Sequence, residues 1–185
     1  MDSISPSGLF ATVHRFHLYL DELLHLHQEA LFEKDIVLAL EFWQLHTAML
    51  RLHIELEEQW LLPALERSVV KPARGAAIYR AEHGKILSLG DMLSQTLGSL
   101  RNTVPTRRVL IALLDKQRSY KNVLEHHEER EEKGLLPELG ASLSAGEIDQ
   151  LNSTCVTCWD DLHRCQRATV TRLIRRLDAY PDLSP

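Results

Sequence analysis

The sequence predicts an all-α protein, an up-down antiparallel four-helix bundle with an additional C-terminal helix. Apolar residues recur at helical spacing along most of the chain, and no convincing run alternates with the period of two that a β-strand needs. Short connectors with Pro and Gly separate the helical stretches. Because short connectors join antiparallel neighbours, we expect the long helices to pack side by side.

Capping and turn residues define the ends of each expected helix. The first helix begins near Ser5 and Pro6, a capping residue followed by proline at the first helical position. The last helix begins at Ser144, which forms a capping box with Glu147. We expect helices over about residues 5–34, 35–63, 76–100, 106–139 and 144–180, with residues 1–143 forming the bundle and 144–185 packing on it within one domain.

Composition excludes several classes of protein. The 185 residues are 44% hydrophobic and 25% charged, with a net charge of −5, and the basic residues are dispersed except for an Arg-rich end, so we expect no nucleic-acid partner. No apolar run is long enough for a transmembrane helix, and no secretion signal is visible. Three cysteines in the last fifth of the chain make no disulfide framework, which favours the cytoplasm.

One sequence motif occurs twice. HIELEEQWLLPALE at residues 53–66 returns as HEEREEKGLLPELG at residues 127–140, and the two stretches match at eight of fourteen positions. The first two helices therefore look like one hairpin and the next two like its repeat. This symmetry predicts that each hairpin contributes half of a shared site.

The repeated His and Glu lie on the apolar face of their helices. His53 is at the centre of one apolar stripe and Glu57 lies about 40° from it, whereas Glu58 is expected to face away. His127 and Glu131 repeat this geometry, and Glu132 is expected to face away. A buried carboxylate must be protonated, paired or bound to a metal. A buried hydrogen-bonded His–Glu pair explains a single copy, whereas two copies at matching depth favour a metal.

The other two helices each add a histidine to an apolar face. His83 lies on the stripe of residues 76–100, and His17 lies on that of residues 5–34 with His14 at its margin, which leaves the choice between His14 and His17 open. Imidazole with carboxylate suits iron, manganese or zinc, and the set is too large for one tetrahedral zinc. Two six-coordinate ions bridged by both carboxylates would leave about two positions open for a small ligand. The expected metal ligands are His17, His53, Glu57, His83, His127 and Glu131.

These motifs resemble the haemerythrin family, specifically its bacterial HHE cation-binding domain. The resemblance covers about residues 8–140 and rests on FHLYLDELL, HIELEEQWLLPALE, AEHGKIL and HEEREEKGLLPELG. It implies a non-haem centre of two iron ions with an oxo or hydroxo bridge that binds dioxygen or nitric oxide. In that mapping His17 and His53 serve one iron and His83 and His127 the other, with Glu57 and Glu131 bridging.

The sequence departs from the oxygen-carrying members at two positions. Tyr79 stands where they have the first histidine of an HxxxH pair, and Glu131 follows its histidine by four residues where they have an Asp at five. Tyr79 is open to three interpretations: a weak ligand, a hydrogen-bond donor to bound oxygen, or a packed aromatic. Trp60 and Met49 are expected to line the metal pocket.

The cysteines do not suggest a further metal site. Cys158 and Cys165 lie two turns apart on one helix face, too far to share an ion, and the helical context does not suit the CxxC of Cys155 and Cys158 as a redox motif. We therefore expect ordinary core or surface cysteines.

Three functions remain as hypotheses. The favoured one is binding or sensing of dioxygen or nitric oxide at a di-iron centre, acting through an unidentified protein partner or a homodimer. The second is a di-iron oxidoreductase or iron-handling enzyme that turns over peroxide or ferrous iron. The third is a helical interaction module that binds zinc or no metal.

Overall fold

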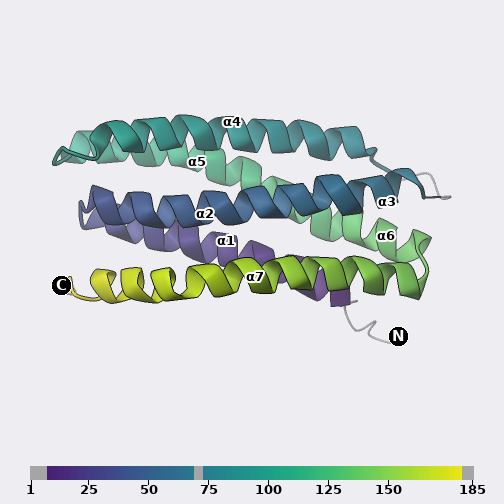
Figure 1. Ribbon diagram of the computed structural model, residues 1–185. Coiled ribbons are helices and arrows are strands. Elements are labelled where there is room, and N and C mark those ends of the chain that lie inside the picture. Colours follow the sequence, from purple (N-terminus) through teal and green to yellow (C-terminus); the bar gives the residue numbers. More distant parts are fainter. Residues whose placement is uncertain (1–7, 69–72, 181–185) are drawn as a thin grey trace, which may run out of the picture.

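The computed structural model describes residues 8–68 and 73–180, most of which are helical and none of which form a β-strand. Helices α1 (Gly8–Phe32), α2 (Ile36–Leu56), α4 (Ala76–Leu100), α5 (Arg107–Arg130) and α7 (Ala145–Leu177) run roughly along a common direction (Figure 1). α1 packs against α2, α4 packs against α5, and α2 also packs against α4. α7 packs along α1 and α2. The all-helical fold class is therefore confirmed.

Local signals in the sequence locate most helix ends. α4 begins and ends at the expected residues, and α7 begins after Ser144, whose side chain forms the expected capping box with Glu147. Asp35 caps α2 by accepting a hydrogen bond from the backbone N–H of Leu38 at 2.9 Å. The expected start at Ser5 and Pro6 and residues 69–72 of the expected connector lie outside the described residues.

Each repeated motif contains a π turn that sequence analysis did not predict. η1 (Glu57–Leu61) follows α2, and η2 (Glu131–Leu135) follows α5. The backbone N–H of Leu62 donates to the carbonyl of Glu57, five residues back, and Leu136 donates to Glu131 in the same way. The helices then continue as α3 (Leu62–Glu66) and α6 (Leu136–Ser142).

The prolines of the motif explain this geometry. Pro63 and Pro137 are the second residues of α3 and α6, so one leucine separates each proline from the preceding π turn. Proline has no N–H to donate, and in a regular α-helix its ring would clash with the carbonyl four residues back. The wider π turn accommodates the ring without ending the helix. The repeated Leu-Leu-Pro is therefore the local signal for a π turn directly after each His-x-x-x-Glu.

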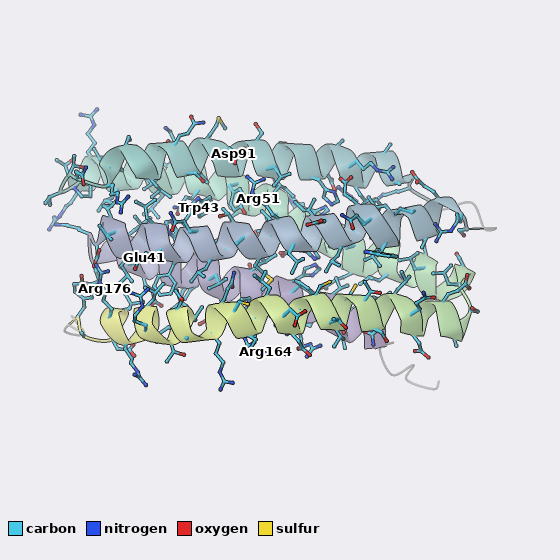
Figure 2. All side chains as sticks on the ribbon, in the orientation of Figure 1. Glu41, Trp43, Arg51, Asp91, Arg164 and Arg176 are labelled. Atoms are coloured by element: carbon cyan, nitrogen blue, oxygen red, sulfur yellow. The ribbon has the colours of Figure 1, made fainter. Side chains whose placement is uncertain are left out.

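Charged side chains connect the helices at the surface. Arg51 of α2 pairs with Asp91 of α4 at 2.8 Å, and Arg176 of α7 pairs with Glu41 of α2 at 3.6 Å (Figure 2). Exposed pairs of this kind contribute roughly 0–1 kcal/mol each, so most of the stability comes from the buried apolar faces. Within the described residues, no helix combines the length and apolar character needed to cross a membrane.

Candidate metal centre

The structure brings the six expected ligands together in the interior between the helices. α1, α2, α4 and α5 each contribute one histidine, and the two glutamates are the first residues of the π turns. Each of the six residues is at most 3% exposed: His17, His53, Glu57, His83, His127 and Glu131.

Glu57 lies among three of the histidines. Its Oε2 is 2.9 Å from Nε2 of His83 and 3.7 Å from Nε2 of His127. Its Oε1 is 3.3 Å from Nε2 of His53. One carboxylate from the first hairpin therefore contacts imidazoles of both hairpins.

Glu131 has the equivalent position in the second hairpin. Its Oε2 is 3.1 Å from Nε2 of His17 and 3.4 Å from Nε2 of His53, and its Oε1 is 2.6 Å from Nε2 of His127. The two carboxylates thus lie between the four imidazoles, and each imidazole turns its Nε2 toward them.

The four imidazoles form two close pairs. The ring centroids of His17 and His53 are 5.0 Å apart with an interplanar angle of 87°. Those of His83 and His127 are 4.8 Å apart at 83°. These are the two pairs that the resemblance assigns to separate metal ions, although the ligand roles themselves stay predictions.

Carboxylates also contact the outer nitrogens of three rings. Nδ1 of His17 is 2.9 Å from Oε1 of Glu132, and Nδ1 of His83 is 2.8 Å from Oε1 of Glu58. Nδ1 of His127 is 3.2 Å from Oε2 of Glu82. Such contacts orient a ring so that Nε2 faces a metal, and they raise its basicity.

Two of these carboxylates correct the sequence analysis, which expected Glu58 and Glu132 to face away. A helical wheel measures direction from one helix axis only. The side of η1 that carries Glu58 faces α4, so Glu58 contacts His83 of that helix. Glu132 reaches His17 of α1 in the same way. The repeated Glu-Glu doublet was the signal in the sequence for a role of the second glutamate, because a glutamate that only faces solvent has no reason to recur at the same position.

The two halves of the centre differ at the residue that precedes the histidine. In α4 this residue is Glu82, which contacts His127. In α1 it is Phe16, which stacks on His53 with the ring centroids 5.5 Å apart and an interplanar angle of 29°. One half therefore has a carboxylate, which also pairs with Arg130, where the other has a phenyl ring.

The charges of the cluster shift the pKa values of its members. Burial alone lowers the pKa of His17, but the hydrogen bond and charge of Glu131 outweigh it and raise the pKa to about 9. Burial likewise opposes protonation of His127, and the charge of Glu131 raises its pKa to about 9. Burial opposes ionisation of Glu131, but the charge of His127 outweighs it and holds the pKa of Glu131 well below its usual range.

Several buried atoms of the cluster have no hydrogen-bond partner among the described residues. They include Nε2 of His53, Oε1 of Glu57, Nε2 of His127 and Oε1 of Glu131. His127 Nε2 and Glu131 Oε1 approach closely, yet without hydrogen-bond geometry. Buried polar atoms are normally paired, and these atoms converge as ligands of a common ion do. The residues present therefore fit a metal ion.

The other expected site residues have different positions. His14 is exposed and contacts Glu132 at 2.8 Å, whereas His17 faces the cluster, so the geometry favours His17. Tyr79 is fully buried, and its hydroxyl has no hydrogen-bond partner among the described residues. Gly134 leaves room for it, because a Cβ there would lie 3.1 Å from the Tyr79 hydroxyl.

Trp60 does not join the cluster. It is 44% exposed and lines a surface hollow with Arg67 and Leu143. A π turn advances each residue by a smaller angle than an α turn, so Trp60 falls short of the apolar stripe. Met49 is fully buried.

The structure also contains a buried carboxyl that sequence analysis did not single out. Glu128 is 7% exposed, and its Oε1 has no hydrogen-bond partner among the described residues. Burial raises its pKa to about 8, against the opposing charge of His17. All three cysteines are free, with Cys155 buried, Cys158 half-buried and Cys165 exposed.

Fold and site together define an all-helical protein with a buried His/Glu group that could hold a metal ion. The ligand atoms of His53, Glu57, His127 and Glu131 all lie within 4.8 Å of one another. Comparison with family models, curated proteins and solved structures gives no match to this chain. The chemistry of the site must therefore be argued from its own residues.

Proposed function

We propose that the chain is a haemerythrin-like di-iron protein that binds or senses dioxygen or nitric oxide. The proposal includes the finer architecture, in which α1, α2, α4 and α5 form an up-down antiparallel bundle and α7 is the additional helix. A cytoplasmic location is part of the same proposal. The di-iron proposal rests on the resemblance of the repeated motif to the haemerythrin family and on the geometry of the buried cluster.

One observation supports the proposal best. Four buried imidazoles turn Nε2 toward two buried carboxylates, and ligand atoms among them have no hydrogen-bond partner in the described part of the chain. A purely structural His–Glu network would satisfy these atoms, because an unpaired buried polar group costs about 1–3 kcal/mol. His17, His53, His83 and His127 with Glu57 and Glu131 would hold the iron.

The donor set also favours two ions over one. Six side chains exceed the four ligands of a structural zinc, and mixed imidazole and carboxylate ligands suit iron. Bound iron would supply redox activity and open positions for a diatomic ligand. The residues around it then determine the environment: Glu58, Glu82 and Glu132 orient the imidazoles, and Phe16 covers His53 with an apolar ring.

Metal analysis of the protein, purified from cells grown with added iron, tests this proposal. We expect about two iron atoms per chain and an absorption spectrum that changes when dioxygen or nitric oxide is added. His53→Ala and Glu131→Ala should each lower the iron content strongly, whereas His25→Ala, on the exposed side of α1, should not. Purified protein without iron, or with one zinc per chain, would overturn the proposal.

The enzymatic alternative differs in its readout. Turnover of peroxide or ferrous iron by the iron-loaded protein, lost in Glu57→Gln, would indicate an oxidoreductase. A centre that only takes up and releases a diatomic ligand would indicate a binding protein or sensor. A sensor would pass its state to a protein partner or to a second copy of the chain.

A further inference from the structure

A second buried polar group lies between the helices, away from the candidate metal centre. It consists of His46 and Trp43 on α2 and Tyr120 on α5, all of them at most 1% exposed. The hydroxyl of Tyr120 lies 2.6 Å from Nε2 of His46. None of the three residues has a role in the proposed function so far.

The hydrogen bonds determine where the protons are. Nδ1 of His46 lies 3.0 Å from the backbone carbonyl of Leu20, which can only accept, so Nδ1 carries the proton. Nε2 of a neutral His46 is then a lone pair, and Tyr120 donates its O–H to it. The phenol proton therefore already points at a base inside a site that excludes water.

This pair lies at a defined distance from the metal centre. His46 precedes His53 by seven residues on α2, and Tyr120 precedes His127 by seven residues on α5. Seven residues are two turns, about 10 Å along each helix, and they return the side chain to the same face. The Tyr120–His46 hydrogen bond thus spans the two helices two turns away from the cluster.

We propose that Tyr120 is a redox-active tyrosine whose oxidation is coupled to proton transfer to His46. This inference rests on the proposed function for the bound iron, and added peroxide, which would oxidise that iron, supplies the oxidising equivalent. Tyr120 would give one electron to the oxidised iron. The O–H bond of Tyr120 breaks and an N–H bond forms at Nε2 of His46, so a neutral tyrosyl radical and an imidazolium result.

The surroundings favour a coupled transfer over separate steps. Burial raises the pKa of Tyr120, so the phenol does not lose its proton before the electron leaves. Burial also lowers the pKa of His46 to about 4, so the ring is neutral and ready to accept. An oxidised phenol is a far stronger acid than the phenol itself, and it protonates even a weak base at hydrogen-bond distance.

Trp43 is placed to stabilise the imidazolium. Its ring stacks on His46 with centroids 5.4 Å apart and an interplanar angle of 27°, which suits a cation–π contact. Its indole N–H donates to the hydroxyl of Ser94 at 2.7 Å, which holds the ring between α2 and α4 (Figure 2). The carbonyl of Leu20 accepts from the other side of the imidazolium.

Electron paramagnetic resonance of the iron-loaded protein, frozen after addition of peroxide, tests the proposal. We expect a tyrosyl radical signal that narrows when the tyrosines are ring-deuterated and disappears in Tyr120→Phe. Tyr19→Phe is the control, because the hydroxyl of Tyr19 donates to the amide oxygen of Gln166, which cannot take up a proton, and this variant should keep the signal. A signal that persists in Tyr120→Phe, or an iron-loaded protein without any radical, would overturn the inference.

A second measurement separates this inference from the proposed function. The protein as purified, whatever metal it holds, is oxidised by a flash-generated ruthenium(III) complex. We expect the Tyr120 radical again, at least tenfold weaker in His46→Gln, whose amide accepts the hydrogen bond but cannot take up the proton. Equal yields in wild type and His46→Gln would overturn the role of His46 even if the protein binds two irons. Circular dichroism checks that each variant is folded.

Discussion

Glu131 and Glu132 contact both nitrogens of one histidine: Oε2 of Glu131 is 3.1 Å from Nε2 of His17, and Oε1 of Glu132 is 2.9 Å from its Nδ1. His83 is held in the same way by Glu57 and Glu58, at 2.9 and 2.8 Å. Each Glu-Glu doublet therefore positions the histidine of the opposite hairpin. The two hairpins are thereby connected at the candidate metal centre itself.

The outer glutamate of each doublet should matter for metal affinity. We expect Glu132→Ala to weaken metal binding about 10- to 100-fold, because His17 loses the carboxylate that orients it. Competition with a coloured chelator measures the affinity. Glu129→Ala is the control, since Glu129 is exposed and its ion pairs within the described residues are with Lys133 and His126. Equal affinities in the two variants would contradict an orienting role for Glu132.

Removing the hydroxyl of Tyr79 should stabilise the protein. Tyr79→Phe deletes a buried group that has no hydrogen-bond partner in the described structure, and we expect a gain of about 1 kcal/mol in the free energy of unfolding. Tyr120→Phe should have the opposite sign, because it leaves Nε2 of His46 unpaired. Urea unfolding measures both. An unchanged iron content in Tyr79→Phe would identify Tyr79 as a packed aromatic, whereas a lower one would make it a ligand.

Metal binding should release protons. The pKa values of His17 and His127 lie near 9 without metal, so both rings are protonated at pH 7.5, and a metal must displace those protons. Both values exceed the ordinary 6.5, so the stability that these groups contribute to the metal-free protein is complete below pH 6.5 and is lost as the pH rises through 9. Calorimetry in buffers of different protonation enthalpy should show about two protons released at pH 7.5 and fewer at pH 10. No release at pH 7.5 would contradict the assignment.

Acid should destabilise the protein through His27, which is buried near the C-terminal end of α1. Burial outweighs the hydrogen bond to the carbonyl of Ala39 and lowers the pKa of His27 to about 4, below the 6.5 of the unfolded chain. Its neutral ring therefore contributes stability that is present above pH 6.5 and lost as the pH falls toward 4. We expect the unfolding free energies of wild type and His27→Gln to converge between pH 7 and 4.5. His25→Gln, an exposed control on the same helix, should run parallel to wild type.

Local chemistry of the sequence predicts the helices and most of their ends. The capping box at Ser144, the boundaries of α4 and the apolar stripes follow from neighbours along the chain, which is why they could be predicted. The doubled His-x-x-x-Glu likewise places His53, Glu57, His127 and Glu131 on buried faces, because their phase depends only on helical spacing. The structure agrees with these predictions for the described residues.

The rest depended on how the helices pack. Glu58 and Glu132 face away on a single-helix wheel and contact His83 and His17 only because a neighbouring helix lies beside each flank. The π turns rotate Trp60 to the surface, and the Tyr120–His46 bond joins residues 74 positions apart. The sequence by itself thus determined which residues each helix buries, since that follows from periodicity. Only the tertiary structure decided which buried or flanking groups meet, since distances between helices have no counterpart in local spacing.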